Sequence, residues 1–99
     1  MQKTTSSMHN TIFLSLLRDC RESMRLRQAD LAMRLGRGQA TVSKVERGER
    51  RLDVIELRAW LGALEVDFLT FMSELDKRLR PLPVVDPIFL AKRSRRRQS

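Results

Sequence analysis

Apolar residues recur along this chain at the spacing of helices. Over residues 11–24 they stand three or four positions apart, at Ile12, Phe13, Leu16, Leu17, Cys20 and Met24. This spacing places them on one face of a helix. Asn10, just before the stretch, is a residue type that caps helix N-termini. The pattern therefore predicts a first amphipathic helix over 11–24.

The middle of the chain holds two shorter segments, over 28–35 and 39–47. Each is followed by a glycine, Gly36 or Gly48, at the point where a helix end often needs a left-handed residue. Their apolar positions each define one face, formed by Leu31, Ala32 and Leu35 in the first and by Val42 and Val45 in the second. Two short helices joined by a turn of about three residues are typical of a helix-turn-helix unit.

Two further helices are predicted to begin at aspartates. Asp53, with Glu56 three residues later, forms a variant of the capping box and opens a helix over 54–64. Asp67 caps a helix over 68–80, which prolines end. The expected inward positions are Val54, Leu57, Leu61, Leu64, Phe68, Leu69, Met72, Leu75 and Leu79; Trp60, Phe68 and Phe71 are interpreted as core or subunit-contact residues. The sequence thus predicts an all-α, five-helix bundle containing a helix-turn-helix.

Three parts are expected along the chain. Residues 1–10 form a flexible arm that includes a solvated His9, residues 11–80 form the helical domain, and residues 81–99 form a Pro-containing basic tail. The tail holds a short apolar patch over 88–91 and the basic run KRSRRR. Tails of this kind are the part of a chain least expected to be ordered.

Composition argues against several classes of protein. With 99 residues, one Cys and one His, the chain has no internal disulfide, no multi-cysteine zinc site and no expected metal or cofactor. Cys20 lies on an apolar stripe, and no phosphate-binding loop or acid-base cluster stands out, so we do not expect an enzyme. No apolar run approaches a membrane span, and the stretch MQKTTSSMHN has no apolar core of the kind found in signal peptides, so neither feature is expected. A cytoplasmic, nucleoid-associated location is the expectation.

The charge is polarised along the chain. The net charge is +8, with excess positive charge over residues 34–51 and 77–99 and excess negative charge over residues 52–76. A basic segment of this kind favours a polyanionic partner.

The run QADLAMRLGRGQATVSKVERGERRLDVIELRAWLGALEV resembles the helix-turn-helix family of phage repressors and Cro proteins, also called the xenobiotic-response type. The most specific positions are Gln28, Ala32, Gly36, Val42 and Val45. Two positions depart from the family pattern: Arg27 replaces the small cap before the second helix, and Glu65 replaces a glycine before Val66. The second departure requires either that Glu65 accepts a strained turn or that the turn itself differs.

The resemblance implies a double-stranded DNA partner, with the third helix in the major groove. Gln39, Ala40 and Lys44 occupy the family's base-reading positions, and their chemistry suits adenine, a thymine methyl and guanine respectively. Gln28 matches a position that donates to a phosphate. Further expected phosphate contacts are Arg37, Thr41, Ser43, Arg47, Arg50 and Arg51.

The resemblance also implies a structural ion pair between Arg21 and Glu46, which joins the first helix to the end of the third. The alternative is an exposed Glu46 that pairs locally with Arg50, a contact worth only a few tenths of a kcal/mol. If Glu46 is occupied by Arg21, the third helix presents a more positive face.

Together these observations predict a sequence-specific DNA-binding transcription regulator, a repressor that occupies its operator as a homodimer. Expected dimer contacts are Phe68, Phe71, Met72 and Leu75, or the patch over 88–90. One alternative is an antitoxin of a toxin-antitoxin pair, whose tail over 81–99 binds a protein partner. Another is a nonspecific nucleic-acid binder driven by the basic tail.

Overall fold

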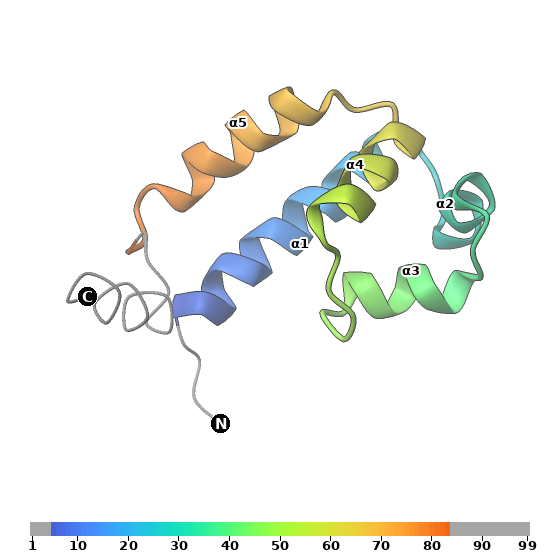
Figure 1. Ribbon diagram of the computed structural model, residues 1–99, viewed down its shortest axis with the longest axis horizontal. Helices are drawn as coiled ribbons and strands as arrows, with labels where there is room; N and C mark the ends of the chain where they lie inside the picture. Colours follow the sequence, from blue (N-terminus) through green and yellow to red (C-terminus); the bar gives the residue numbers. More distant parts are fainter. Residues whose placement is uncertain (1–4, 84–99) are drawn as a thin grey trace, which may run out of the picture.

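Five helices follow one another in the computed structural model, which describes residues 5–83 (Figure 1). They are α1 (Thr5–Ser23), α2 (Gln28–Leu35), α3 (Gln39–Glu46), α4 (Val54–Ala63) and α5 (Phe68–Leu79). No strand occurs within this range. The all-α, five-helix prediction is therefore confirmed. The apolar patch over 88–91 and the run KRSRRR lie outside the described residues, so the predictions about the tail stay predictions.

The first helix is longer than its apolar stripe predicted. It begins at Thr5 rather than at residue 11, so Asn10 lies inside α1 and is not its cap, and His9 is a half-buried helical residue rather than part of a flexible arm. Residues 5–10 contain no Gly or Pro that would stop a helix. The side chain of Asn10 lies against Gly48, in the loop after α3. This tertiary contact has no local signal in the sequence.

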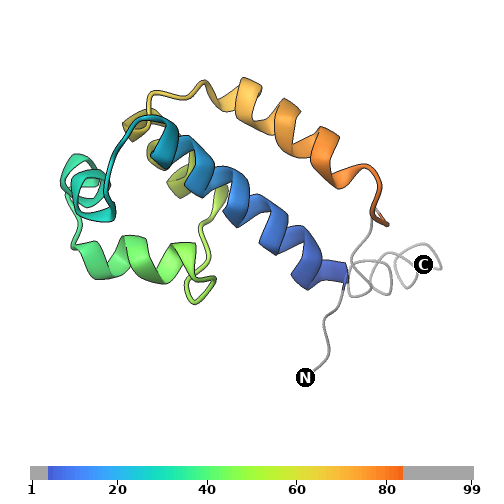
Figure 2. The ribbon, with the colours of Figure 1, turned by 180° about the vertical axis from the view of Figure 1, so that it is seen from behind.

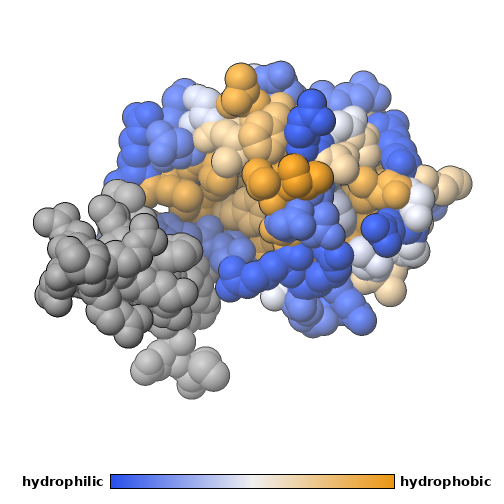
Figure 3. Space-filling model, viewed as in Figure 1, coloured by the Kyte–Doolittle hydropathy of each residue, from blue (hydrophilic) through white to orange (hydrophobic). Residues whose placement is uncertain are grey.

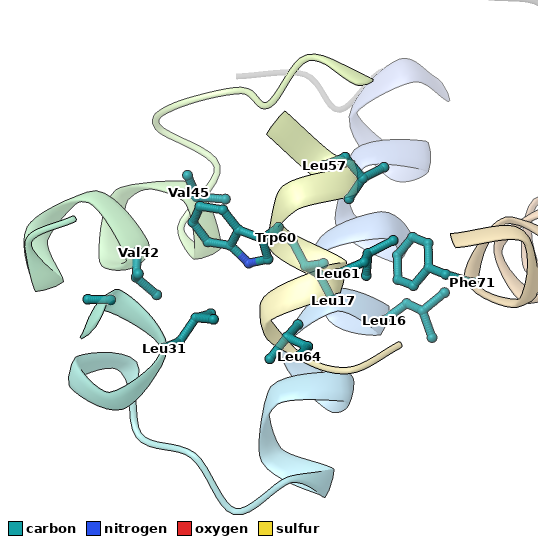
Figure 4. Packing of buried hydrophobic residues seen from close by; sticks show 11 residues of the cluster. Leu16, Leu17, Leu31, Val42, Val45, Leu57, Trp60, Leu61, Leu64 and Phe71 are labelled. Atoms are coloured by element: carbon teal, nitrogen blue, oxygen red, sulfur yellow. The ribbon is translucent and has the colours of Figure 1, made fainter. Parts of the chain in front are cut away.

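The helices pack around one core. In both ribbon views α5 lies along α1, while α2 and α3 form a separate corner at one end of the bundle (Figures 1 and 2). The core consists of buried side chains from all five helices and the turn after α4: Leu16, Leu17, Leu31, Ala32, Val42, Val45, Leu57, Trp60, Leu61, Leu64 and Phe71 (Figure 4). The predicted inward positions of α2 and α3 are confirmed, Leu35 being partly buried.

Two predicted inward residues are wrong. Val54 is 59 % exposed and Leu69 is 74 % exposed. Phe71 takes the buried place on α5, where its ring packs edge-on against Phe13 with centroids 6.1 Å apart. Positions 69 and 71 lie about 200° apart around a helix, so only one of them can face α1. The larger aromatic ring occupies the core.

The helix N-termini are held by aspartates. In α4, Asp53 Oδ1 accepts from the Glu56 N–H at 2.7 Å and Glu56 Oε1 accepts from the Asp53 N–H at 3.0 Å, so the capping box is confirmed. Asp67 accepts from the Thr70 N–H at 3.0 Å. The guanidinium of Arg27 cannot accept a hydrogen bond. Instead, Asp30 accepts from both the N–H and the guanidinium of Arg27, and these bonds lower the pKa of Asp30 to about 2.

Glu65 adopts the left-handed conformation that its position requires. Its φ is 61°, and the turn is closed by the Val66 N–H, which donates to Leu61 O at 2.9 Å. A non-glycine residue in this region carries a strain of about 1 kcal/mol or more. The side chain of Glu65 forms an exposed ion pair with Arg34 at 3.4 Å. Exposed pairs add little to the free energy of unfolding, so this contact does not offset the strain.

We expect Glu65→Gly to raise the free energy of unfolding by about 0.5 to 1 kcal/mol, because glycine has no strain at positive φ. Denaturant titration measures the change. Arg58→Gly, at an exposed position inside α4, is the matched control and should lower the same free energy by about 1 kcal/mol. A loss of stability in both variants would contradict the strain argument.

Candidate nucleic-acid interface

The turn between α2 and α3 sets the angle of the two helices. Gly36 ends α2 in the left-handed region with φ 67°, and no atom lies within 4 Å of a Cβ placed there, so its conformation rather than space calls for glycine. The Arg37 N–H donates to Ala32 O at 2.9 Å and completes the cap. Gly38 then precedes the first residue of α3.

The rotation of α3 about its axis is fixed by its buried residues. Val42 and Val45 are completely buried against the rest of the bundle. The opposite side exposes Gln39, Ala40 and Lys44, while Thr41 and Ser43 are half-buried at the edges. The three base-reading positions implied by the resemblance therefore lie on the outer side of α3.

A buried ion pair ties the end of α3 to α1. Arg21 Nε donates to Glu46 Oε2 at 2.7 Å and Arg21 Nη2 donates to Glu46 Oε1 at 3.0 Å. Both residues are less than 10 % exposed. Arg21 Nη1 also donates to Leu26 O at 2.6 Å, so the guanidinium holds the loop after α1 as well. Glu46 makes no local pair with Arg50, which binds Glu56 instead.

Glu46 has two further polar neighbours. Gln28 Nε2 donates to Glu46 Oε1 at 3.0 Å, and Arg18 Nε lies 3.7 Å from the same oxygen. Gln28 is expected to donate to a phosphate. In this structure its side-chain amide donates to Glu46 instead. Arg18 was missed by the sequence analysis, although it lies three residues before Arg21 and so shares its side of α1.

The arginines that follow α3 differ in their partners. Arg47 binds Glu49 at 2.9 Å and also donates to the Ser43 hydroxyl, and Arg50 binds Glu56 at 2.8 Å. The hydrogen bond from Arg47 lowers the pKa of Glu49, and that from Arg50 lowers the pKa of Glu56.

Three other cations of this region carry no such partner. Within residues 5–83, no carboxylate forms an ion pair with Arg37, Lys44 or Arg51. All three are exposed. The cations around α3 therefore form two groups. Arg47 and Arg50 are neutralised by carboxylates, whereas Arg37, Lys44 and Arg51 form no ion pair within the described part of the chain.

Other kinds of site receive no support from the part of the chain described. Across residues 5–83 there is no group of three His, Cys, Asp or Glu side chains that could hold a metal ion. In the same range no helix has the length and apolar character needed to cross a membrane. Cys20 is half-buried on α1, and burial raises the pKa of its thiol.

Comparison with known proteins places this arrangement in a family. A helix-turn-helix family model matches residues 17–71, more than half of the chain. The structure is similar to an XRE-family like protein from Pseudomonas syringae pv. tomato str. DC3000, with 37 % identity and a TM-score of 0.70 over 74 % of this chain and 89 % of that one. It is also similar to the wild-type restriction-modification controller protein C.Esp1396I, with 24 % identity and a TM-score of 0.66 over 72 % and 93 % of the two chains.

A comparison with curated protein sequences gave no match. The family model spans α2, α3 and α4 and so includes the outward-facing residues of α3. The chain belongs to the XRE-type helix-turn-helix family of DNA-binding transcription regulators.

Proposed function

We propose that this protein is a sequence-specific regulator that binds an operator in double-stranded DNA through α3 and represses transcription by occupying it. The observation that carries the proposal is the division of α3 into a buried side, formed by Val42 and Val45, and an exposed side with Gln39, Ala40 and Lys44. A helix fits the major groove of B-DNA, where base edges are distinguishable. One of the similar solved structures is described as a restriction-modification controller protein, and a regulatory role for this protein is consistent with that description.

Base reading is assigned to the exposed side of α3. Gln39 can form a bidentate pair with adenine, and Ala40 can contact a thymine methyl. Lys44 lies five positions after Gln39, about 140° around the helix, and reaches sideways to guanine or to a phosphate. A groove that wraps the helix admits all three side chains.

Phosphate contacts follow from the pairing of the cations. Arg37 and Arg51 are unpaired among residues 5–83, so they meet phosphates without breaking a bond. Arg47 must first leave Glu49, at a cost of about 0 to 1 kcal/mol for an exposed pair. Arg50 must first leave Glu56, with which it forms a half-buried pair. Gln28 must likewise leave Glu46, while Thr41 and Ser43 are placed at the edge of α3. We therefore propose Arg37 and Arg51 as the main cationic contacts.

A single module of this kind reads few base pairs, so we propose a homodimer on a two-fold operator. Phe71 is removed from the expected dimer contacts because it is buried, and Phe68, Met72 and Leu75 are partly buried against the core. Leu69 is the exposed apolar residue of α5. Hydrophobic side chains gather on the face formed by α4 and α5 (Figure 3), and we propose that Leu69 contacts the second subunit.

Selection of bound fragments from a random DNA pool, followed by titration of single-base variants, tests the assignment. We expect Gln39→Ala to lose about tenfold or more in preference at one base pair of each half-site, because a bidentate contact discriminates by about 1 to 3 kcal/mol. Arg51→Ala, the control, should weaken all sequences alike. For a dimer, half-site centres should lie about 10 to 10.5 base pairs apart, or a multiple.

Two outcomes would contradict the proposal. Equal affinity for selected and unrelated DNA would favour the nonspecific binder, and a uniform loss in Gln39→Ala would remove Gln39 from base reading. The antitoxin alternative depends on residues 81–99, of which 84–99 lie outside the described range, and no observation here favours it. We propose a role without catalysis.

A further inference from the structure

A cavity of about 120 Å³ lies where the end of α2, the start of α3 and α4 meet. Its apolar wall consists of Leu35, Leu52, Ala59 and Trp60. Figure 4 shows the indole of Trp60 projecting from α4 toward α3. Its N–H finds no acceptor within residues 5–83, so packing alone holds the ring. An apolar cavity of about 150 Å³ can hold benzene, so this smaller one has room for about five carbon atoms.

The polar wall of the cavity has an unbalanced positive charge. It consists of Arg37, Thr41, Arg50 and Glu56. Both oxygens of Glu56 already have a donor, because Oε2 accepts from Arg50 at 2.8 Å and Oε1 accepts from the Asp53 N–H at 3.0 Å. The hydrogen bond from Arg50 lowers the pKa of Glu56, and the positive charge of Arg37 also lowers it, although Arg37 forms no ion pair with Glu56. Arg37 has no ion-pair partner among the described residues. The cavity therefore offers one free guanidinium and one hydroxyl beside an apolar floor.

We propose that this cavity binds a small organic monoanion whose apolar body of about five carbon atoms lies against Trp60 and Ala59 and whose anionic group meets Arg37 and Thr41. We expect neither the anionic group alone nor the apolar body alone to bind tightly. A bare anion meets an exposed guanidinium in water, and a neutral body leaves the guanidinium unpaired. A ligand that combines both matches the two walls.

Binding of the anion has a consequence for DNA. Arg37 and Thr41 are among the proposed phosphate contacts, so a bound anion withdraws them from the phosphates. We expect the occupied protein to bind its operator more weakly. This part of the inference rests on the proposed function.

The cavity has a built-in spectroscopic probe. Trp60 is the single tryptophan of the chain, which has no tyrosine, so fluorescence excited at long wavelength reports on this wall. The full chain, without DNA, is titrated with hexanoate, with acetate as the charge alone and with hexanamide as the matched neutral body. We expect a saturable change in emission with hexanoate, none with acetate, and binding of hexanamide weaker by about tenfold, as for the loss of one charge-assisted hydrogen bond.

Three variants locate the response. Ala59→Leu fills the cavity from an exposed position of α4 and should abolish the saturable change. Arg37→Gln should weaken hexanoate binding by about tenfold. Arg58→Gln removes one charge from α4 outside the cavity and should leave binding unchanged. Thermal melts show that each variant is folded. No saturable change in the unmodified protein, or an equal loss in Arg58→Gln, would overturn the site.

The effect on DNA is measured separately. With the selected operator, saturating hexanoate should lower affinity by roughly fivefold or more, within the usual range of coupling between sites, and acetate should not. An unchanged affinity, with saturable binding to the free protein, would overturn the coupling and leave the site standing. Saturable binding in a protein that prefers no DNA sequence would overturn the proposed function alone.

Discussion

Replacing Leu61 by alanine is expected to lower the free energy of unfolding by about 2 to 5 kcal/mol. Leu61 is completely buried and belongs to the same cluster as Leu17 and Phe71, on α1 and α5 (Figure 4). Truncation removes buried methyl groups and leaves a cavity that three helices border. A loss of this size approaches the whole stability of a small domain, and thermal or denaturant unfolding measures it.

The control for this prediction is Met33→Ala, a truncation of similar size at a residue of α2 that is 78 % exposed. We expect it to alter the free energy of unfolding by about 0.5 kcal/mol or less. Leu31→Ala, at a completely buried position of α2, should behave like Leu61→Ala. Unfolding curves of Leu61→Ala and Met33→Ala that coincide would show that α4 is not packed as described.

Local signals account for most of the fold that could be predicted. The bounds of α2 follow from its apolar face and from Gly36, and the start of α4 follows from the reciprocal bonds of Asp53 and Glu56. Tertiary contacts account for what was missed. Nothing local in residues 5–10 distinguishes a helix that packs on Gly48 from a solvated arm, and spacing alone does not decide whether Leu69 or Phe71 faces α1.

The candidate site shows the same division. The exposure of Gln39 and Lys44 follows from the burial of Val42 and Val45, which a helical pattern already predicts. The partners of Gln28, Arg47 and Arg50 depend on how loops and helices meet, so no spacing rule gives them. The resemblance named Arg21 and Glu46, but the contacts of Glu46 with Arg18 and Gln28 required the structure.

Removing the carboxylate of Glu46 is the second change with a large expected effect. Glu46→Ala leaves the guanidinium of Arg21, itself 8 % exposed, without its buried charged partner, with only the exposed Glu22 remaining at 3.9 Å, and leaves the Gln28 amide without its acceptor. An uncompensated buried charge of this kind costs about 3 to 5 kcal/mol. We expect Glu46→Ala to lower the free energy of unfolding by that amount, measured by denaturant titration.

A variant that removes both charges separates the effect of the unpaired charge from that of the packing around it. The double variant Arg21→Met with Glu46→Leu removes both charges, so we expect it to be more stable than Glu46→Ala, because a buried pair replaced by apolar groups is often neutral in stability. The bond from Arg21 to Leu26 O is also lost, at a cost of about 1 to 3 kcal/mol if that carbonyl stays unpaired. Glu49→Ala, which breaks an exposed pair with Arg47, should cost less than about 1 kcal/mol. If the double variant were no more stable than Glu46→Ala, the unpaired charge would not be the cause of the loss.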